Sequence, residues 1–337
     1  MVILGGTSFT IGENIVTIEE TTSYNLSDYI SEEGADYYVF INAEGRVVAN
    51  TIRTPAEGYM FIGQFHTLCV DCNENMTGLI SVGNIQKLVG DYFDIMNYFK
   101  YQDVDFANFY HKKIVAMNNG SPYNVATIDH PLSDFKARDI LPESVWCLNF
   151  HPKCKNWDGM VYCNASEICV DIYHNSGSGD ELVSEYGSVH TNDVIWLNAT
   201  HNLNLVGKRN LFWKEFINVA SGSNELTKIQ GSVDQSTVGG HVDTAGRRMI
   251  SFIGCEECCG YLTAFQTEAC TGVEYGYPVN DGRGLFGANY DTPRYIDFGG
   301  AFDSPIDRCG SRGNDGNPIY ANLNDLSVRG CCNVSIV

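Results

Sequence analysis

The chain has 337 residues, with 21 lysines and arginines against 41 aspartates and glutamates, and a formal net charge of −20. This excess of acid argues against nucleic acid or an anionic membrane as a partner, because both select basic surfaces. Hydrophobic residues at 44% and aromatic residues at 12% exclude a disordered polypeptide. No apolar run approaches the roughly 20 residues that span a bilayer, and residues 1–14 lack the features of a secretory signal. We therefore expect a soluble globular protein with no membrane insertion.

The first 72 residues carry the pattern of a small β domain. Two β-rich arms, at residues 36–41 and 46–49, flank an Asn-Ala-Glu-Gly loop and predict a hairpin. Further strands are predicted at residues 60–63 and 67–70. No helical periodicity occurs in this part, so we expect a small sheet or prism.

Residues 73–137 have a different pattern, which predicts a partly helical insertion between two β regions. Apolar side chains recur at i, i+4, i+7, i+8 and i+11 from Leu88 to Phe99, and this spacing places them on one face of a helix. Such a face most often packs into a core.

The remaining chain, residues 138–337, predicts short strands at 160–162 and 170–173 and a helix over 211–220. Beyond residue 221 it is rich in Gly, Asn and Asp. Roughly 115 residues of plain loop would be unusual in a compact domain, so we expect long loops held in order by turns and buried polar contacts. Loops of this kind commonly bind ligands.

Thirteen cysteines, an odd number, are spread along the chain. Two Cys-x-x-Cys motifs, at residues 69–72 and 255–258, have the spacing of zinc knuckles, but a zinc site needs four converging ligands and these motifs are far apart in sequence. We expect buried thiols together with a few local disulfides, such as Cys147–Cys154 or Cys163–Cys169.

The most specific pattern is a run of thirteen residues, Gly-Gly-His-Val-Asp-Thr-Ala-Gly-Arg-Arg-Met-Ile-Ser, at positions 239–251, followed by Ile-Gly-Cys-Glu-Glu-Cys-Cys-Gly at 253–260. These blocks resemble the major tropism determinant-like variable proteins of diversity-generating retroelements in phages and prophages. The resemblance covers residues 36–72 and 138–337 and leaves 73–137 unmatched. Further blocks match in order at residues 63–71, 139–146, 159–162, 170–173, 222–225, 298–302, 309–312 and 328–330.

The residue patterns and the resemblance together predict an α+β chain with three parts. The patterns give a small N-terminal β domain (1–72) and a partly helical insertion (73–137), and the resemblance implies a C-type-lectin-like domain with long ordered loops (138–337). The lectin fold of this family is related to that of the formylglycine-generating enzyme. The resemblance also implies a homotrimeric protein of a phage fibre or tail tip, made in the host cytoplasm and carried on the virion surface. Its partners would be a host surface receptor, protein or glycan, and other virion proteins.

The residues between the matched blocks are candidates for the receptor-binding face. They mix Tyr with small polar residues, as paratopes do, because Tyr gives large rigid contacts while small polar groups adapt. The blocks at 299–300, 309–312 and 328–330 are expected to be scaffold. Mutation of Asn codons at adenine yields Ser, Asp, Ile and Tyr, so the mixture fits a diversified copy and a fixed relative equally. The candidates are Tyr275, Tyr277, Tyr290, Asp303, Ile306, Asp307, Arg308, Asp315, Asn317, Ile319, Tyr320, Asn322 and Asn324.

Two alternative functions stay open. A head-fibre or capsid decoration protein, which binds no receptor, would fit the unmatched insertion and the incomplete Asn pattern. A cysteine-dependent oxidase would fit the related formylglycine-generating fold, with Cys309 and Cys331 or Cys332 as candidate thiols. The sequence lacks a Ser/His/Asp string, a P-loop and a paired-carboxylate signature, so we expect no enzyme.

Two alternative sites occur within the thirteen-residue run. His241 and Asp243, with Asp234 nearby, could ligate a metal, but a lone histidine more often makes structural hydrogen bonds. We expect no cofactor, and we expect folding to need no divalent cation, because calcium sites gather six to eight oxygen ligands. Arg247 and Arg248 could bind an anion, but in so acidic a chain we expect them to pair with internal carboxylates and carbonyls.

Overall fold

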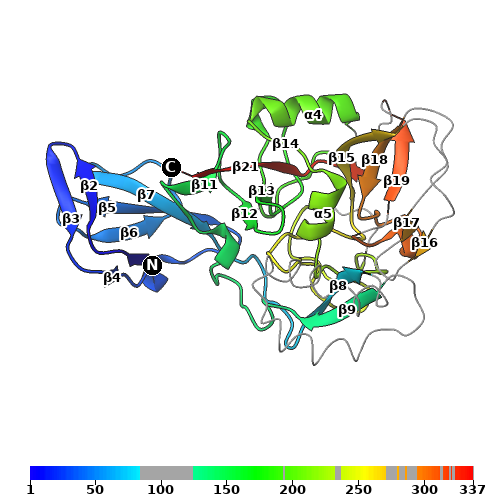
Figure 1. Ribbon diagram of the computed structural model, residues 1–337, viewed down its shortest axis with the longest axis horizontal. Helices are drawn as coiled ribbons and strands as arrows, with labels where there is room; N and C mark the ends of the chain where they lie inside the picture. The colour runs from blue at the N-terminus through cyan, green and yellow to red at the C-terminus, as the bar shows by residue number, and fades with distance from the viewer. Residues whose placement is uncertain are drawn as a thin grey trace.

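The computed structural model describes residues 1–83, 124–192, 194–231, 237–270, 279–280, 285–286, 294–311, 314–318, 320 and 323–336. In this part of the chain β structure dominates, and α4 (Trp196–Leu205) and α5 (Trp213–Val219) are the two α-helices. Neither of these helices is long and apolar enough to cross a membrane. The molecule is elongated, with the strands of the first 66 residues at one end and a sheet from residues 263–327 at the other (Figure 1).

The N-terminal part is antiparallel β structure, as the sequence predicts. The predicted hairpin is present, and the side-chain oxygen of Asn42 closes its turn by accepting the backbone N–H groups of Glu44 and Arg46. The strands are β1 (Val2–Ile3) with β4 (Thr22–Ser23), β2 (Thr7–Ile11) with β3 (Asn14–Ile18), and β5 (Asp36–Asn42) between β6 (Val47–Asn50) and β7 (Tyr59–His66).

The strand predicted at residues 67–70 is wrong. Thr67 makes an isolated bridge to Ile140, and the residues after it bond to an irregular segment. The backbone N–H of Leu68 donates to the carbonyl of Asp139, and that of Cys72 donates to the carbonyl of Phe135. A loop partner does not offer the regular spacing of a ladder, so strand pairing ends with β7.

A nine-stranded sheet, counted over the described residues, joins the N-terminal strands to the C-terminal half. Its C-terminal strand β21 (Gly330–Ile336) pairs with three strands from different parts of the chain and crosses the middle of Figure 1. The last strand of the chain therefore fastens its two halves together. The other strands here are β10 (Trp146–Cys147), β11 (Phe150–Pro152), β12 (Met160–Cys163), β13 (Ile168–Asp171) and β14 (Arg209–Asn210).

The two predicted strands correspond to β12 and β13, and the predicted helix corresponds to α5. Phe216 and Val219 of α5 are buried in the largest apolar cluster of the described chain, as the spacing predicts. Phe212 is the N-cap residue of this helix, and its backbone N–H donates to the carboxylate of Glu215. Its side chain is 41% exposed and so is not part of the buried face.

Helix α4 was not expected from the sequence. Its ten residues contain three asparagines and a threonine, which are weak helix formers. Ala199 and Leu203 are fully buried, and the indole N–H of Trp196 donates to the carbonyl of Gln266 at 2.8 Å. Tertiary packing thus outweighs local propensity in this segment.

Parts of the expected insertion form a β ribbon. β8 (Thr77–Gly83) pairs with β9 (Asn124–Asp129) in antiparallel register. The helix predicted from Leu88 to Phe99 lies outside the described residues. Gly78 allows the ribbon to touch the C-terminal half, since a Cβ there would lie 2.4 Å from the Cα of Gly222.

The far end of the molecule is a four-stranded sheet that carries the candidate loops. The strand order of this sheet is β19 (Asn314–Pro318), β18 (Arg294–Phe298), β15 (Thr263–Cys270), β20 (Leu326–Ser327). A separate pair is formed by β16 (Val279–Asn280) and β17 (Leu285–Phe286).

Short 3₁₀ turns occur along the described chain: η1 (Ser27–Tyr29), η3 (Pro142–Ser144), η4 (Gly179–Glu181) and η5 (Ile306–Arg308).

The expected local disulfides are wrong: the twelve cysteines that the structure describes are present as thiols. Cys163 and Cys169 belong to neighbouring strands but to different buried clusters, because alternate residues of a strand point to opposite faces. Cys147 is exposed, whereas Cys154 packs against the cluster around Met160. The expectation of buried thiols is confirmed for most of the twelve.

Candidate functional site

Two glycines after β18 fix the start of the candidate loop. Gly299 and Gly300 have φ angles of +97° and +66°, a conformation that side chains disfavour. A Cβ on Gly299 would lie 2.3 Å from the carbonyl oxygen of Cys258, and one on Gly300 would lie 2.7 Å from that of Arg308. The backbone N–H of Gly260 donates to both glycine carbonyls. Only glycine fits this close approach, so the pair is scaffold.

A buried carboxylate holds the end of the same loop. Ser311 is fully buried and donates its backbone N–H and its hydroxyl to the two carboxylate oxygens of Glu225, at 2.7 and 2.8 Å. The backbone N–H of Leu226 donates to the carbonyl of Cys309. Charge-assisted bonds of this kind are stronger than neutral ones, and they pin the loop to the segment that follows α5.

The block at residues 328–330 is also buried scaffold. Arg329 is fully buried, and its guanidinium donates to the carbonyls of Asp171, Ile172 and Glu256. The carboxylate of Asp171 accepts the backbone N–H of Gly330 at 2.9 Å and forms a buried ion pair with Lys208 at 2.5 Å. Removing one member would leave a buried charge without compensation.

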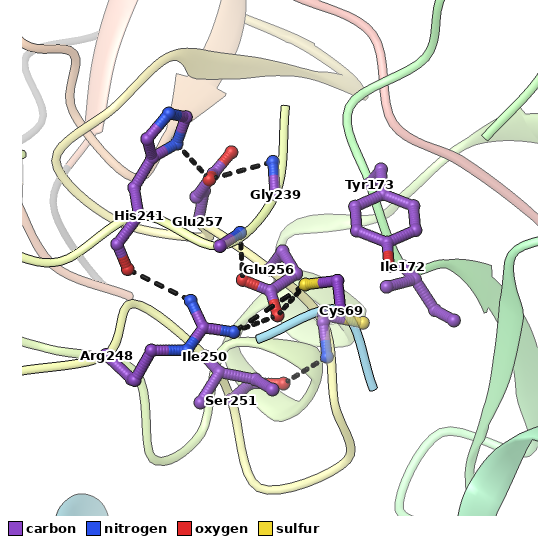
Figure 2. Close-up of polar contacts among 12 residues, drawn as sticks. Cys69, Ile172, Tyr173, Gly239, His241, Arg248, Ile250, Ser251, Glu256 and Glu257 are labelled. Carbon is purple, nitrogen blue, oxygen red and sulfur yellow. Dashed lines mark hydrogen bonds and ion pairs between the residues drawn. The ribbon is translucent and has the colours of Figure 1, made fainter. Parts of the chain in front are cut away.

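The thirteen-residue run and the block after it form a buried polar network (Figure 2). Arg248 pairs with Glu256 at 2.5 Å and donates to the carbonyl of His241 at 3.0 Å. Glu256 also accepts the Cys69 thiol at 3.4 Å. Glu257 accepts the backbone N–H of Gly239 and the Nδ1 of His241. These bonds satisfy most of the buried polar atoms of the network, while the Nε of Arg248 and the Oε2 of Glu257 make no hydrogen bond in the described part of the chain.

The two arginines therefore pair internally, as expected. Arg247 contacts Asp243 at 2.6 Å, and Asp243 also accepts backbone N–H groups of the same turn. His241 bonds to Glu257, and although burial lowers the pKa of His241, this hydrogen bond and charge raise it overall. Asp234 lies outside the described residues. No group of three His, Cys, Asp or Glu side chains in the described ranges is arranged to hold a metal.

The candidate residues that the structure describes lie on and beside the scaffolded loop. Ile306 is 59% exposed and Tyr320 is 75% exposed. Asp303 and Asn324 are exposed, and Arg308 is half-buried. The turn η5 that carries Ile306 contacts β17, a described strand that lies between Tyr277 and Tyr290 in the sequence.

The other candidates are described in part or not at all. Asp315 and Asn317 lie in the edge strand β19, opposite Asp297 and Tyr295, while their side chains and that of Asp307 are not described. The candidates outside the described residues are Tyr275, Tyr277, Tyr290, Ile319 and Asn322.

Cavities away from the candidate loop were not expected, and two of them have distinct linings. One, of about 410 Å³, is lined by acidic residues including Glu33, Asp36 and Asp158, and burial together with the charge of Asp36 raises the pKa of Asp158. The other, of about 720 Å³, is an apolar groove between β1–β2 and the 145–149 segment. Their lining residues are distant in sequence, so no local pattern could reveal them.

The candidate site is thus a set of exposed side chains of different chemical types, which lie on a buried polar scaffold at one end of a mostly β protein. The solved structures to which the chain is similar include the Major Tropism Determinant I1, M1 and P3c variants, with TM-scores of 0.65, 0.66 and 0.66. Each alignment covers 100% of this chain and 81% of the other, at 18% sequence identity. No family model matches the chain, and no curated protein matches it in sequence. The chain therefore has the Major Tropism Determinant fold, as its sequence blocks predict.

Proposed function

We propose that this chain is a phage receptor-binding protein of a fibre or tail tip, which attaches the virion to a host surface receptor. The single observation that supports this most is the contrast within residues 299–311. Asp303 and Ile306 are exposed, while Gly300 and Ser311 at either end are held in the scaffold. A protein that must vary its binding residues needs them on side chains that bury little, because surface changes cost about 0.5 kcal/mol or less.

We propose the division at residues 72 and 137, with a C-type-lectin-like binding domain over 138–337. All described candidate residues fall in this last part. The scaffold contacts from Glu225, Gly260 and Asp171 also come from within it. The binding face and its support would then belong to one unit, so diversification would leave the rest of the virion protein unchanged.

The proposal involves no catalysis. Cys309 and Cys331 are fully buried, with Sγ contacts to the carbonyls of Ala301 and Asn210. Burial raises the pKa of Cys331 well above its ordinary value. Reactive cysteines are instead accessible and have lowered pKa values, so these two support a scaffold role over that of an oxidase.

Binding of the purified protein to cells of candidate host bacteria tests the proposal. We expect Tyr320→Ala and Ile306→Ala to weaken binding tenfold or more and to move the melting temperature little, because both side chains are mostly exposed. Gly300→Ala is the matched variant in the scaffold. It should cost about 1–3 kcal/mol of stability through strain at a positive φ.

The proposal would be abandoned if the wild-type protein bound none of the cells, envelope fractions or glycans of a broad host panel. A position on the capsid lattice in images of the particle would then favour a decoration protein. Equal binding by wild-type, Tyr320→Ala and Ile306→Ala proteins would keep the function and move the binding face elsewhere.

A further inference from the structure

Three cysteines that are far apart in sequence meet in the middle of the nine-stranded sheet. Cys169 of β13 and Cys332 of β21 are direct partners in the antiparallel ladder. On the other side of β21, Pro152 of β11 is opposite Val334, and the backbone N–H of Lys153 donates to the carbonyl of Asn333 at 2.8 Å. Continuing this register by one residue brings Cys154 alongside Cys332.

The two neighbours of Cys332 are not equivalent. The hydrogen bond from Lys153 to Asn333 marks a hydrogen-bonded position of the ladder, so the next pair, Cys154 with Cys332, falls on a non-hydrogen-bonded position. There, Cα atoms lie about 4.5 Å apart and side chains are closest. A disulfide needs Cα atoms about 4.4–6.8 Å apart, a range that includes both kinds of pair, so the closer side chains are what favour the non-hydrogen-bonded pair. The backbone groups of Cys332 then point toward Cys169, so Cys169 and Cys332 form a hydrogen-bonded pair. In such a pair the two side chains are farther apart than in a non-hydrogen-bonded pair.

The side chains confirm that these residues share one face. Cys169 and Cys332 belong to one buried cluster with Met160, and Cys154 packs against that cluster. The thiol of Cys154 donates to the carbonyl of Asn156 at 2.9 Å, and its Sγ lies 3.6 Å from the Sδ of Met160, a member of the same cluster as Cys332. Cys154 is only partly buried, so it is the member that a small oxidant can reach.

We propose that Cys154 and Cys332 are a disulfide site, which closes when the folded protein meets a two-electron oxidant of the peroxide class. The Cys154 thiolate attacks one peroxide oxygen and breaks the O–O bond, which forms the sulfenic acid and releases hydroxide. The proton that the Cys154 thiol lost on ionisation converts this hydroxide to water. The Cys332 sulfur then displaces hydroxide from that sulfenic acid, which leaves as water with the thiol proton. In sum, two thiols are oxidised to one disulfide, and one peroxide is reduced to two waters.

The surroundings set the rate of this reaction. The neighbouring Cys332 side chain and burial raise the pKa of Cys154. The Cys154 side chain lowers the pKa of Cys332, but the Cys169 side chain and burial outweigh this effect and raise the pKa to about 12. Because the thiolate is the nucleophile, closure should be slow at neutral pH and faster as the pH rises. The thiols would therefore persist in a reducing cytoplasm.

The bond would tie the end of the β11 segment to β21, the strand that fastens the two halves of the molecule. It would close a loop of slightly more than half the sequence, and long loops gain most from a crosslink that restricts the unfolded chain. For a virion protein, a role that rests on the proposed function, this would add stability after release into an oxidising medium.

The test uses the purified full chain, reduced, freed of reductant and treated with hydrogen peroxide in its folded state. Remaining thiols are then alkylated in denaturant, and peptides are mapped by mass spectrometry. We expect a crosslinked pair containing Cys154 and Cys332, a loss of two hydrogen atoms from the intact mass, and a higher melting temperature that reductant reverses. The yield at a fixed time should be higher at pH 9 than at pH 7.

Variants separate this site from other oxidation. Cys154→Ser should abolish the crosslink, whereas Cys169→Ser and Cys147→Ser, the latter at the exposed cysteine, should retain it. A crosslink between Cys169 and Cys332, or a Cys154 oxidised to sulfinic acid with Cys332 still a thiol, would overturn the proposal. Neither result depends on receptor binding, so failure here leaves the proposed function untouched.

Discussion

At the scale of single residues, the buried His130 and His174 and the half-buried His241 have opposite effects on stability as the pH changes. Burial lowers the pKa of His130 to about 4, and burial also lowers that of His174 well below its ordinary value. The unfolded chain binds protons near pH 6.5, so both groups make the fold less stable as the pH falls below that value. His241 has a raised pKa, so its contribution is complete below pH 6.5 and is lost as the pH rises through the folded value.

His130 should be a measurable part of this acid sensitivity. Between pH 7 and pH 5 its lowered pKa should remove about 2 kcal/mol of stability. The reason is that His130 becomes protonated in the unfolded chain over this range but stays mostly neutral in the folded protein. In His130→Asn the loss of stability over this range should shrink by about that amount, even though the variant is weaker at both pH values. Urea unfolding at the two pH values measures the difference.

His201, which is exposed on α4, provides the matched control. The variant His201→Asn should keep the wild-type pH dependence. If His130→Asn lost as much stability between pH 7 and pH 5 as the wild type, the buried histidine would not be the group responsible.

At the scale of elements, the ribbon of β8 and β9 brings together the two chain positions that flank residues 84–123. Gly83 and Asn124 are paired directly across the ribbon, so the ends of the segment between them are already adjacent. Replacing residues 84–123 by Asn-Gly should close a two-residue hairpin with the turn that such strands prefer. We expect the variant to fold, with a melting temperature within a few degrees of the wild type by circular dichroism.

A second variant with a Gly-Asn-Gly-Ser linker controls for strain in the short turn. If neither variant folds, residues 84–123 are part of the folding unit and the ribbon is no boundary. If both fold but lose binding to host cells, the insertion takes part in receptor contact.

The elements also show how far the sequence could be followed. The hairpin around Asn42 and helix α5 were predictable, because turn chemistry and a strong apolar period are local signals. Helix α4 and the partners of residues 67–72 were not, because distant contacts decide them. The expected local disulfides were wrong for the same reason. Cys332 lies beside Cys154 and Cys169 because of the register of the sheet, which sequence spacing does not reveal.

At the scale of the whole molecule, the sequence blocks predicted the fold better than they predicted the site. Gly299, Ser311 and Arg329 were expected to be scaffold and are buried, since each has a steric or hydrogen-bonding reason to stay fixed. The exposed candidates have no such constraint, so nothing in the chain dictates what they bind. Steric and hydrogen-bonding constraints can thus be recognised from the sequence, whereas the chemistry of a binding partner leaves no such local signal.

The last prediction concerns assembly. We propose a homotrimer, and the apolar groove near the N-terminus is the surface that it would bury. Val2, Leu4 and Val145 line the groove and are 57%, 67% and 52% exposed. Exposed apolar patches of this kind commonly mark interfaces. Several tethered copies would also strengthen a weak receptor contact, because the second contact becomes intramolecular.

Light scattering at micromolar concentration should give three times the chain mass of 37.3 kDa. Leu4→Asp combined with Val145→Asp should shift the protein to monomers, because burying two unpaired carboxylates in an apolar contact costs several kcal/mol. Val189→Asp is the control, since Val189 is 67% exposed but does not line the groove. A wild-type monomer would contradict the trimer. A trimer that persists in the double variant would contradict only the groove as its interface, and would direct attention to the other exposed faces of the N-terminal strands.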